Sequence, residues 1–337
     1  MGAPNATSTA VLGAGSWGTA LALLLSRNAH PTVLWAHRPE HAAAMAHERR
    51  NARFLPDAEF PPLLKVTANL GDAVGEAQNI LLVVPSKAFR EVLLAIAPLV
   101  RPDQRIVWGT KGLEHETCAL LHTVVEDVFG AERAMAVVSG PSFASEVAAG
   151  LPTAVTVASP DMTCANEVAA LLHSDYFRAY TSTDIVGVQL GGAAKNVLAI
   201  AAGISDGLGF GANARAALIT RGLHELMRLG MALGGQAETF MGLAGLGDLV
   251  LTCTDNQSRN RRAGLALGGG ATLAQALSDI GQVVEGVQAA QEVRALAKRL
   301  EVDMPISEQV WRVLYDGLDP HRAVRTLLAR EQKPENI

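Results

Sequence analysis

The chain has 337 residues, which is enough for two domains that each bury a core. With 49% hydrophobic and 18% charged residues it is not a disordered chain, and its net charge of -5 gives no general attraction to nucleic acid or to an anionic membrane surface. Three widely spaced cysteines (Cys118, Cys164 and Cys253) favour a reduced protein over a disulfide framework or a metal site, and the absence of a signal-peptide pattern makes the cytoplasm the expected location.

In residues 1–183, short aliphatic or β-branched runs alternate with amphipathic segments of helix length. The expected strands are 10–12, 32–35, 65–67, 80–84, 105–108, 136–138, 154–158 and 177–180. This alternation predicts an α/β domain with a Rossmann-like, parallel, doubly wound sheet. Such sheets bind ligands beyond the carboxyl ends of their strands, so the residues that follow the strands are candidates for a site.

The first such turn is Gly13-Ala14-Gly15-Ser16-Trp17-Gly18, between a strand and the predicted helix 19–27. Gly13, Gly15 and Gly18 allow a tight turn and bring backbone N–H groups close to a pyrophosphate at a helix N-terminus. The pattern favours a dinucleotide site over an ordinary glycine-rich turn.

The second strand is followed by His37 and Arg38. An enzyme strict for NAD usually has an acid here, which binds the ribose 2′-hydroxyl. A cation can instead pair with a 2′-phosphate, so we expect NADP(H) to be preferred over NAD(H). A solvated surface arginine is the alternative. Arg53 is a further candidate whose place the sequence does not give.

Two later loops also follow strands. Lys111 lies in Gly109-Thr110-Lys111-Gly112, and Ser142 lies in Ser139-Gly140-Pro141-Ser142. Both loops are expected at the rim of the cleft. We therefore expect functional roles for Lys111 and Ser142 rather than those of ordinary loop residues.

From residue 184 to residue 337 the strand signals stop. After a first helix at 184–206, amphipathic segments are expected at 213–233, 262–267, 273–280, 286–300, 306–315 and 321–328. This pattern predicts an all-helical C-terminal domain, with its first helix facing the dinucleotide site.

The helix expected at 184–206 is apolar or small almost throughout, but it contains Lys195. Burial disfavours a charged amine and lowers its pKa, so a lysine here needs a partner or a task. Gly191, Gly192 and Ala199 lie about one turn away and would let a ligand approach; a lysine that reaches water is the alternative. Polar residues near its centre argue against a membrane span.

Two polar clusters follow. Asp248 ends the glycine-rich stretch 245–248, and Ser258-Arg259-Asn260 lies at an expected helix start. A guanidinium flanked by a hydroxyl and an amide suits bidentate capture of a phosphate. For Arg261 and Arg262 we expect a solvated helix face instead.

Taken together, these segments resemble the bacterial type of NAD(P)-dependent glycerol-3-phosphate dehydrogenase. The resemblance runs from about residue 8 to about residue 330 and is carried by GAGSWGTALA, VPSKAFREVL, TKGLE, GPSFASEVAAGLPTAV, QLGGAAKNVLAIAAGISDGLGFGANARAALITRG, MGLAGLGDLVLTCTDNQSRNRR and VVEGV. It implies a cytosolic enzyme, expected to be a homodimer. The enzyme would interconvert sn-glycerol 3-phosphate and dihydroxyacetone phosphate and supply phospholipid synthesis.

The resemblance also implies roles for residues that match the family's motifs. Lys195 would be the proton acceptor, with Asp248 beside it to orient the lysine or the substrate. The implied cofactor contacts, besides the glycine turn, are Ser16, Trp17, His37, Arg38, Lys111, Ala144, Arg259, Val283 and Glu285. The implied substrate contacts are Lys111, Gly140, Ser142, Lys195, Asp248, Ser258, Arg259 and Asn260.

Two other classes of function remain open at this point. One is a different nicotinamide-dependent dehydrogenase, of the 3-hydroxyacid or ketopantoate type, which would not need Ser258-Arg259-Asn260. The other is a non-catalytic dinucleotide sensor, which would not need a buried lysine that faces the dinucleotide.

Overall fold

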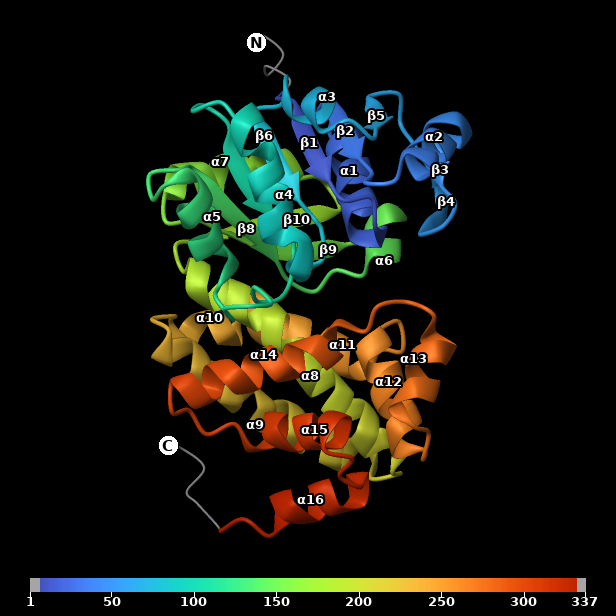
Figure 1. Ribbon diagram of the computed structural model, residues 1–337, viewed down its shortest axis with the longest axis vertical. Coiled ribbons are helices and arrows are strands. Elements are labelled where there is room, and N and C mark those ends of the chain that lie inside the picture. The colour runs from blue at the N-terminus through green and yellow to red at the C-terminus, as the bar shows by residue number, and fades with distance from the viewer. Residues whose placement is uncertain (1–6, 332–337) are drawn as a thin grey trace.

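The computed structural model describes residues 7–331; the outer ends of the two expected domains, 1–6 and 332–337, lie outside the described residues. A sheet covered by helices forms one half of the molecule, and helices alone form the other (Figure 1). The sheet has eight strands, in the spatial order β10 (Phe177–Ser182), β9 (Thr153–Ala158), β8 (Met135–Ser139), β7 (Arg105–Trp108), β6 (Asn79–Leu82), β1 (Thr9–Leu12), β2 (Thr32–Trp35) and β5 (Leu64–Thr67).

The sheet is parallel from β8 to β5, but β9 pairs with β8 in the antiparallel sense. Since β10 is parallel to β9, both strands at this edge run against the others. The doubly wound sheet is confirmed, whereas the expectation that all strands run parallel is wrong at this edge. Hydrophobic patterning marks a buried strand without giving its direction, and antiparallel edge strands are common on such sheets.

Helices cover both faces of the sheet. They are α1 (Ser16–Arg27), α2 (Pro39–Glu48), α3 (Leu70–Val74), α4 (Phe89–Ile96), α5 (Leu121–Phe129), α6 (Ala144–Ala148) and α7 (Met162–Leu172), with short 3₁₀ turns at Ser86–Ala88 and Ala97–Leu99. One apolar core joins α1, α6 and α7 to the sheet, and another joins α3, α4 and α5 to its opposite face. The two cores bury the strands on both sides, which explains their continuous apolar runs.

The sequence pattern missed one small pair of strands, β3 (Arg50–Asn51) and β4 (Leu55–Glu59), which are antiparallel. The β4 sequence, LPDAE, contains proline and aspartate, which are depleted in strands. It therefore resembles a loop when only local propensity is considered.

The C-terminal half confirms the expected helical domain. Its elements are α8 (Ile185–Gly207), α9 (Gly211–Ala232), α10 (Ala237–Met241), a π-helical turn η3 (Leu243–Gly247), α11 (Asp248–Thr254), α12 (Arg259–Gly268), α13 (Leu273–Ile280), α14 (Glu285–Arg299), α15 (Pro305–Tyr315) and α16 (Pro320–Leu328). The sequence did not predict α10, η3 or α11.

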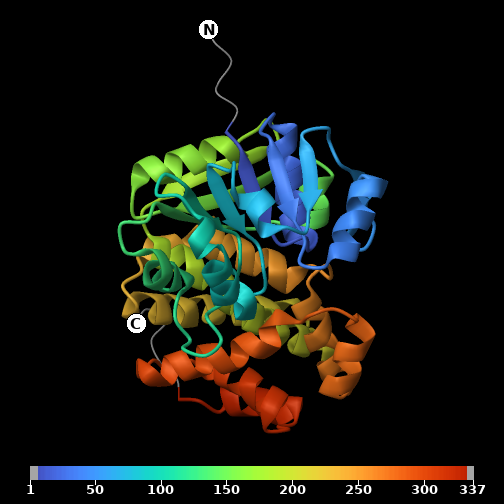
Figure 2. The same cartoon turned by 45° about the horizontal axis from the view of Figure 1, so that its top comes forward.

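Helix α8 connects the two halves. Ile185 and Val188, near its start, pack in the same core as the sheet, while its later residues form the centre of the helical half (Figure 2). By length and composition α8 is the one helix within residues 7–331 that could cross a membrane, but 94% of its apolar window is buried inside the protein. This is the environment of a core helix.

Candidate functional site

The turn between β1 and α1 has a backbone shape that suits a bound pyrophosphate. Gly13 has a φ of +121°, and a Cβ atom there would lie 2.5 Å from the carbonyl oxygen of Val83. A Cβ atom on Gly18 would lie 1.9 Å from the carbonyl oxygen of Gly13, whereas nothing lies within 4 Å of one on Gly15. Gly13 and Gly18 therefore close the turn, and Gly15 leaves the N-terminus of α1 open to an anion.

Asn51 of β3 holds this turn in place, a role that sequence reasoning missed. Its side-chain amide nitrogen is buried and donates to the carbonyl oxygen of Ala14 at 3.0 Å and to the hydroxyl of Thr19 at 2.8 Å. The signal was hidden because Asn51 is distant in sequence from the turn and lies in a segment that resembles a loop.

Ser16 and Trp17 form the start of α1. The indole Nε1 of Trp17 is buried and has no hydrogen-bond partner among residues 7–331. A Cβ atom on Gly109 would lie 2.8 Å from this nitrogen. Trp17 therefore packs against the end of β7, directly before the loop that carries Lys111.

His37 and Arg38 are exposed after β2, where the sequence placed them. The His37 ring meets the Trp35 ring edge-on, with centroids 5.9 Å apart. Arg38 precedes α2, and its side chain makes no hydrogen bond or ion pair with the described part of the chain. Its charge is available to an anionic ligand. Arg53 lies between β3 and β4 with its guanidinium 5.1 Å from the centroid of the Phe54 ring.

The centre of the site is a carboxylate shared by two ammonium groups. Asp248, fully buried at the start of α11, accepts hydrogen bonds from Lys195 through Oδ1 and from Lys111 through Oδ2, the latter at 2.7 Å. Lys195 also donates to the hydroxyl of Thr252 at 2.8 Å, and Lys111 donates to the carbonyl oxygen of Gly140 at 3.3 Å. The sequence did not indicate Thr252, which lies one turn after Asp248.

Burial and charge set the proton affinities at this centre. Desolvation lowers the pKa of Lys195 to about 8, although the negative charge of Asp248 opposes the shift. Burial alone would raise the pKa of Asp248, but Lys111 and Lys195 outweigh it and hold that pKa below its ordinary value. Both protonation states of Lys195 are therefore accessible near neutral pH, while the carboxylate of Asp248 stays charged.

Other protein atoms fill the space beside the glycines near Lys195. A Cβ atom on Gly191 would lie 2.3 Å from the carbonyl oxygen of Ala244, and one on Gly192 would lie 2.8 Å from the hydroxyl of Ser139. The expectation that these glycines leave room for a ligand is wrong. Instead, Gly191 lets η3 pack directly on α8 and so places Asp248 beside Lys195.

The loop after β8 forms one wall of this centre. Gly140 presents its carbonyl oxygen to Lys111, and the hydroxyl of Ser142 donates to the same oxygen at 2.9 Å. Ala144 is half-buried as the first residue of α6. Lys111 and Ser142 therefore share one acceptor, the carbonyl oxygen of Gly140.

The start of α12 gathers the residues expected to bind a phosphate. Ser258 caps the helix by accepting from the backbone N–H of Arg261 at 3.2 Å, which leaves its own hydroxyl hydrogen free to be donated. The Oδ1 atom of Asn260 accepts from the backbone N–H of Gly286 at 2.8 Å. Arg259 is partly exposed, and one of its guanidinium nitrogens lies 4.0 Å from the Glu285 carboxylate.

The start of α14 lies next to these residues. Glu285 begins this helix and accepts a hydrogen bond from the side chain of Asn196 at 3.2 Å. Asn196 follows Lys195 on α8, so this hydrogen bond places the start of α14 close to Lys195. Val283 and Glu285, which are both expected to contact the cofactor, lie just before and at that start. Val283 is 60% exposed.

The expectation that Arg261 lies on a solvated helix face is wrong. Arg261 is buried rather than solvated, and its guanidinium pairs with Asp206 of α8 at 2.6 Å. Arg262 is exposed, as expected. The sequence could not separate the two because the partner of Arg261 lies on a helix that is far away in the chain.

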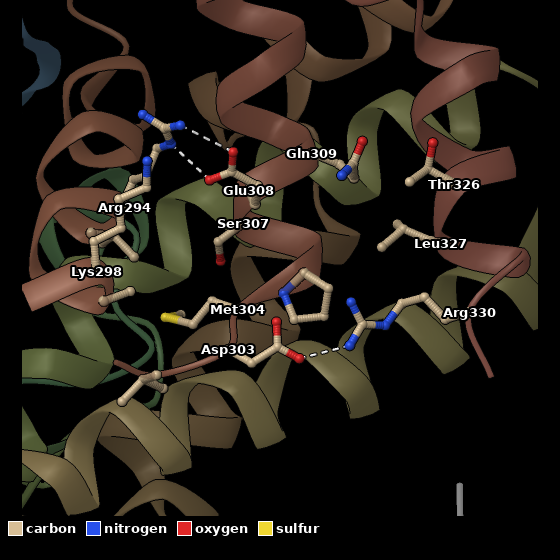
Figure 3. Close-up of a pocket in the computed structure, with 14 residues that line it drawn as sticks. Arg294, Lys298, Asp303, Met304, Ser307, Glu308, Gln309, Thr326, Leu327 and Arg330 are labelled. Carbon is tan, nitrogen blue, oxygen red and sulfur yellow. Dashed lines mark hydrogen bonds and ion pairs between the residues drawn. The ribbon is translucent and has the colours of Figure 1, made fainter. Parts of the chain in front are cut away.

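Two hollows lie away from this centre. A cavity of about 210 Å³ between α14, α15 and α16 is shown in Figure 3; its arginines are paired, Arg294 with Glu308 at 2.7 Å and Arg330 with Asp303 at 2.6 Å. An apolar groove of about 680 Å³ separates α9 from α15 and α16. Neither includes a residue that the sequence predicted for the site.

Family models match nearly the whole chain. The model of the N-terminus of NAD-dependent glycerol-3-phosphate dehydrogenase matches residues 8–165, and that of its C-terminus matches residues 184–325. A glycerol-3-phosphate dehydrogenase [NAD(P)+] from Methylococcus capsulatus is 58% identical over 326 residues, which cover 96% of this chain and 97% of that protein. One from Escherichia coli is 57% identical over 332 residues, covering 98% of both chains.

Solved structures agree in fold. The crystal structure of a glycerol-3-phosphate dehydrogenase from Coxiella burnetii superposes with a TM-score of 0.93 at 51% identity, covering 97% of this chain and all of that one. D-mandelate dehydrogenase and ketopantoate reductase structures, with TM-scores of about 0.6 and at most 16% identity, share the fold alone.

Proposed function

The chain belongs to the NAD-dependent glycerol-3-phosphate dehydrogenase family, and on that basis we propose how its residues interconvert sn-glycerol 3-phosphate and dihydroxyacetone phosphate. The buried Lys195 is the group that exchanges a proton with the C2 oxygen of the substrate. The start of α12 holds the phosphate. The dinucleotide lies over the turn from Gly13 to Gly18.

The hydrogen bonds of Lys195 support its role most directly. An ammonium has three N–H donors, and Asp248 and Thr252 take two of them. The third is left for a substrate oxygen. Two acceptors on one helix, α11, hold the ammonium in a fixed orientation, so that no reorganisation is needed when the substrate oxygen becomes negative.

A bound nicotinamide supplies the hydride for reduction of the ketone and takes it up in the reverse direction. During reduction, Lys195 as ammonium polarises the carbonyl oxygen and donates its proton to it. During oxidation, neutral Lys195 takes the proton from the C2 hydroxyl. A pKa of about 8 makes both forms accessible near neutral pH. Lys111 adds a second positive charge beside the developing oxyanion.

The phosphate end uses Arg259, Ser258 and Asn260. The guanidinium of Arg259 carries the charge, and the first-turn N–H groups of α12 favour an anion. Ser258 donates its free hydroxyl hydrogen. The Oδ1 atom of Asn260 accepts from Gly286, which leaves its amide N–H groups to donate to the phosphate. Binding at this remote group fixes the position of the reacting carbon. Gly140 and Ser142 would face the substrate from the other side.

The enzyme uses NAD(P); our finer proposal is that it prefers NADP(H), because exposed Arg38 stands where an acid would bind the ribose of NAD. His37, Trp17, Ser16, Ala144, Val283 and Glu285 would complete the cofactor contacts. We also propose a cytoplasmic homodimer that supplies glycerol 3-phosphate to phospholipid synthesis. Its domains would meet at residues 183 and 184, between β10 and α8.

A variant of Lys195 tests the proposal. With dihydroxyacetone phosphate and NADPH or NADH, Lys195→Ala should lower turnover by about 10²–10⁴-fold and leave the affinity for the cofactor nearly unchanged. Lys298→Ala, which removes an exposed lysine from α14, is the control and should behave like wild type. Normal turnover in Lys195→Ala would remove this lysine from the chemistry. Failure of the wild-type protein to oxidise either cofactor would contradict the function itself.

A further inference from the structure

Helices α8 and α12 touch through their backbones. A Cβ atom on Gly203 of α8 would lie 2.1 Å from the carbonyl oxygen of Arg261, and one on Gly264 of α12 would lie 2.1 Å from the carbonyl oxygen of Ile200. These distances are far below any contact that a Cβ atom makes. Not even a methyl group fits between the helices at this level, so the glycines set how closely the two axes approach.

The same contact repeats one turn further along both helices. A Cβ atom on Gly207 would lie 2.5 Å from the carbonyl oxygen of Leu265, and one on Gly268 would lie 2.4 Å from that of Ile204. The partners advance together along both helices, so α8 and α12 run in the same direction. We call Gly203, Gly207, Gly264 and Gly268 the glycine seam.

The seam joins the two helices that carry the groups that must cooperate. Towards their N-termini, α8 carries Lys195 and α12 begins with the residues proposed to hold the phosphate. Asn196 and Asn260 converge there on Gly286: a Cβ atom on Gly286 would lie 2.7 Å from the carbonyl oxygen of Asn196 and 2.8 Å from Oδ1 of Asn260. The start of α12 is therefore held beside the turn of α8 that carries the lysine.

A buried ion pair fixes the same two helices independently of the glycines. Arg261 of α12 pairs with Asp206 of α8 at 2.6 Å, and the side chains are 8% and 10% exposed. Asp206 also accepts from Arg215 at 2.7 Å. Sliding α12 along α8 would separate two buried charges, which is strongly unfavourable. Steric contact and charge therefore fix both the separation and the axial offset of the helices.

We infer that the glycine seam determines substrate specificity, because it sets the distance between the proton-transferring ammonium of Lys195 and the phosphate-binding start of α12. The enzyme then selects ketones whose phosphate lies at one particular distance from the carbonyl. The four glycines act through α12 as positioning residues and touch no substrate. This inference rests on the proposed roles of Lys195 and Arg259.

An added methyl group tests it. In Gly264→Ala or Gly203→Ala the new Cβ atom meets a backbone carbonyl that cannot rotate away, so α12 must move by about 1 Å to restore an ordinary contact, and displacements of that size cost about 10²-fold in rate. The readout is the ratio of kcat/KM for dihydroxyacetone phosphate to kcat/KM for dihydroxyacetone, with NADPH as cofactor. Dihydroxyacetone has no phosphate, so its efficiency does not depend on the distance between Lys195 and the phosphate-binding residues.

Gly222→Ala is the matched control. It adds the same methyl group to a buried glycine that contacts α8, but from α9, where the new atom would meet the Leu198 side chain at 2.8 Å. We expect it to lower Tm without changing the substrate ratio. In Gly264→Ala and Gly203→Ala we expect the ratio to fall by about 10- to 100-fold. If Gly264→Ala does not fold, Gly268→Ala at the far end of the seam decides the question in the same assay.

Arg259→Ala separates this inference from the proposed function. If Arg259→Ala lowers the ratio and the seam variants leave it at the wild-type value, the seam has no part in specificity and the inference is overturned, while the function stands. A ratio that is also unchanged in Arg259→Ala would place the phosphate elsewhere and overturn the proposed phosphate site along with the inference. A fall in the ratio in the seam variants and in Arg259→Ala, but not in Gly222→Ala, is the expected result.

Discussion

Replacing Asp248 by asparagine should move the pH dependence of the reaction to lower pH. Asp248 is the carboxylate that faces both Lys195 and Lys111, and its negative charge raises the pKa of Lys195 against the effect of burial. Asparagine keeps the shape of the side chain but removes this charge. The pKa of Lys195 should then fall below about 8, with each unit of change equal to about 1.4 kcal/mol.

The magnitude follows from the fraction of Lys195 that is protonated. With a pKa of about 8, roughly nine tenths of the lysine is ammonium at neutral pH; a pKa lower by about two units would leave roughly one tenth. Ketone reduction needs the ammonium, so this effect alone lowers kcat/KM about tenfold. Loss of the acceptor that orients the ammonium should bring the total loss to about 10²–10³-fold.

The assay is kcat/KM against pH in both directions, because this parameter reports the ionisation of the free enzyme. In the wild type, reduction should weaken and oxidation should strengthen as the pH rises through about 8. In Asp248→Asn both transitions should shift to lower pH, and acidification should restore part of the lost reduction. Asp279→Asn removes an exposed carboxylate from α13 and serves as the control. Transitions that stay in place, or that move to higher pH, would refute the assigned interaction between Asp248 and Lys195.

Three further substitutions have defined outcomes. Arg38→Ala should lower kcat/KM with NADPH by about 10-fold or more and leave kcat/KM with NADH nearly unchanged; equal losses with both cofactors would show that Arg38 does not bind the 2′-phosphate. Thr252→Val removes the second acceptor of Lys195, and we expect turnover to fall by about 10-fold with cofactor affinity retained; full turnover would make this contact dispensable. Glu225 is buried beneath the start of α15, and desolvation raises its pKa from 4.5 to about 7. The stability that this side chain contributes is therefore present below about pH 4.5 and is lost as the pH rises through 7. The free energy of unfolding of Glu225→Gln, measured with denaturant, should therefore rise relative to that of the wild type by up to about 3 kcal/mol between pH 5 and pH 8. A difference between the two proteins that stays constant across that range would exclude the raised pKa of Glu225.

Local patterns were sufficient to predict most of the fold. Strands of continuous apolar residues and amphipathic helices are signals that a short window contains, so each strand of the main sheet is found within two residues of its expected ends. The glycine turn after β1 and the start of α12 also carry local signals, since both depend on residues that are neighbours in sequence. Lys195 stood out for the same reason: a lone charge interrupts an otherwise apolar helix.

The features that escaped prediction depend on residues that are distant in sequence. Arg261 resembles a surface arginine until Asp206 of α8 is placed beside it. Asn51 has no recognisable motif, and its importance comes from the turn that it contacts around Ala14 and Thr19. Thr252 becomes a partner of Lys195 only because Gly191 lets η3 and α11 pack against α8. No window of the sequence contains both members of these pairs.

The composition of α8 is explained by the number of elements that this helix must touch. Near its start it packs on the sheet, at Gly191 it meets the backbone of η3, at Gly192 the end of β8, and at Gly203 and Gly207 the backbone of α12. Contacts at backbone distance on several sides leave no room for long side chains, so the helix is built from small and apolar residues and resembles a membrane span. Lys195 is its one cationic side chain. The close packing that gives α8 this composition also removes water from Lys195, and the same packing therefore brings the pKa of the group proposed to transfer the proton to about 8.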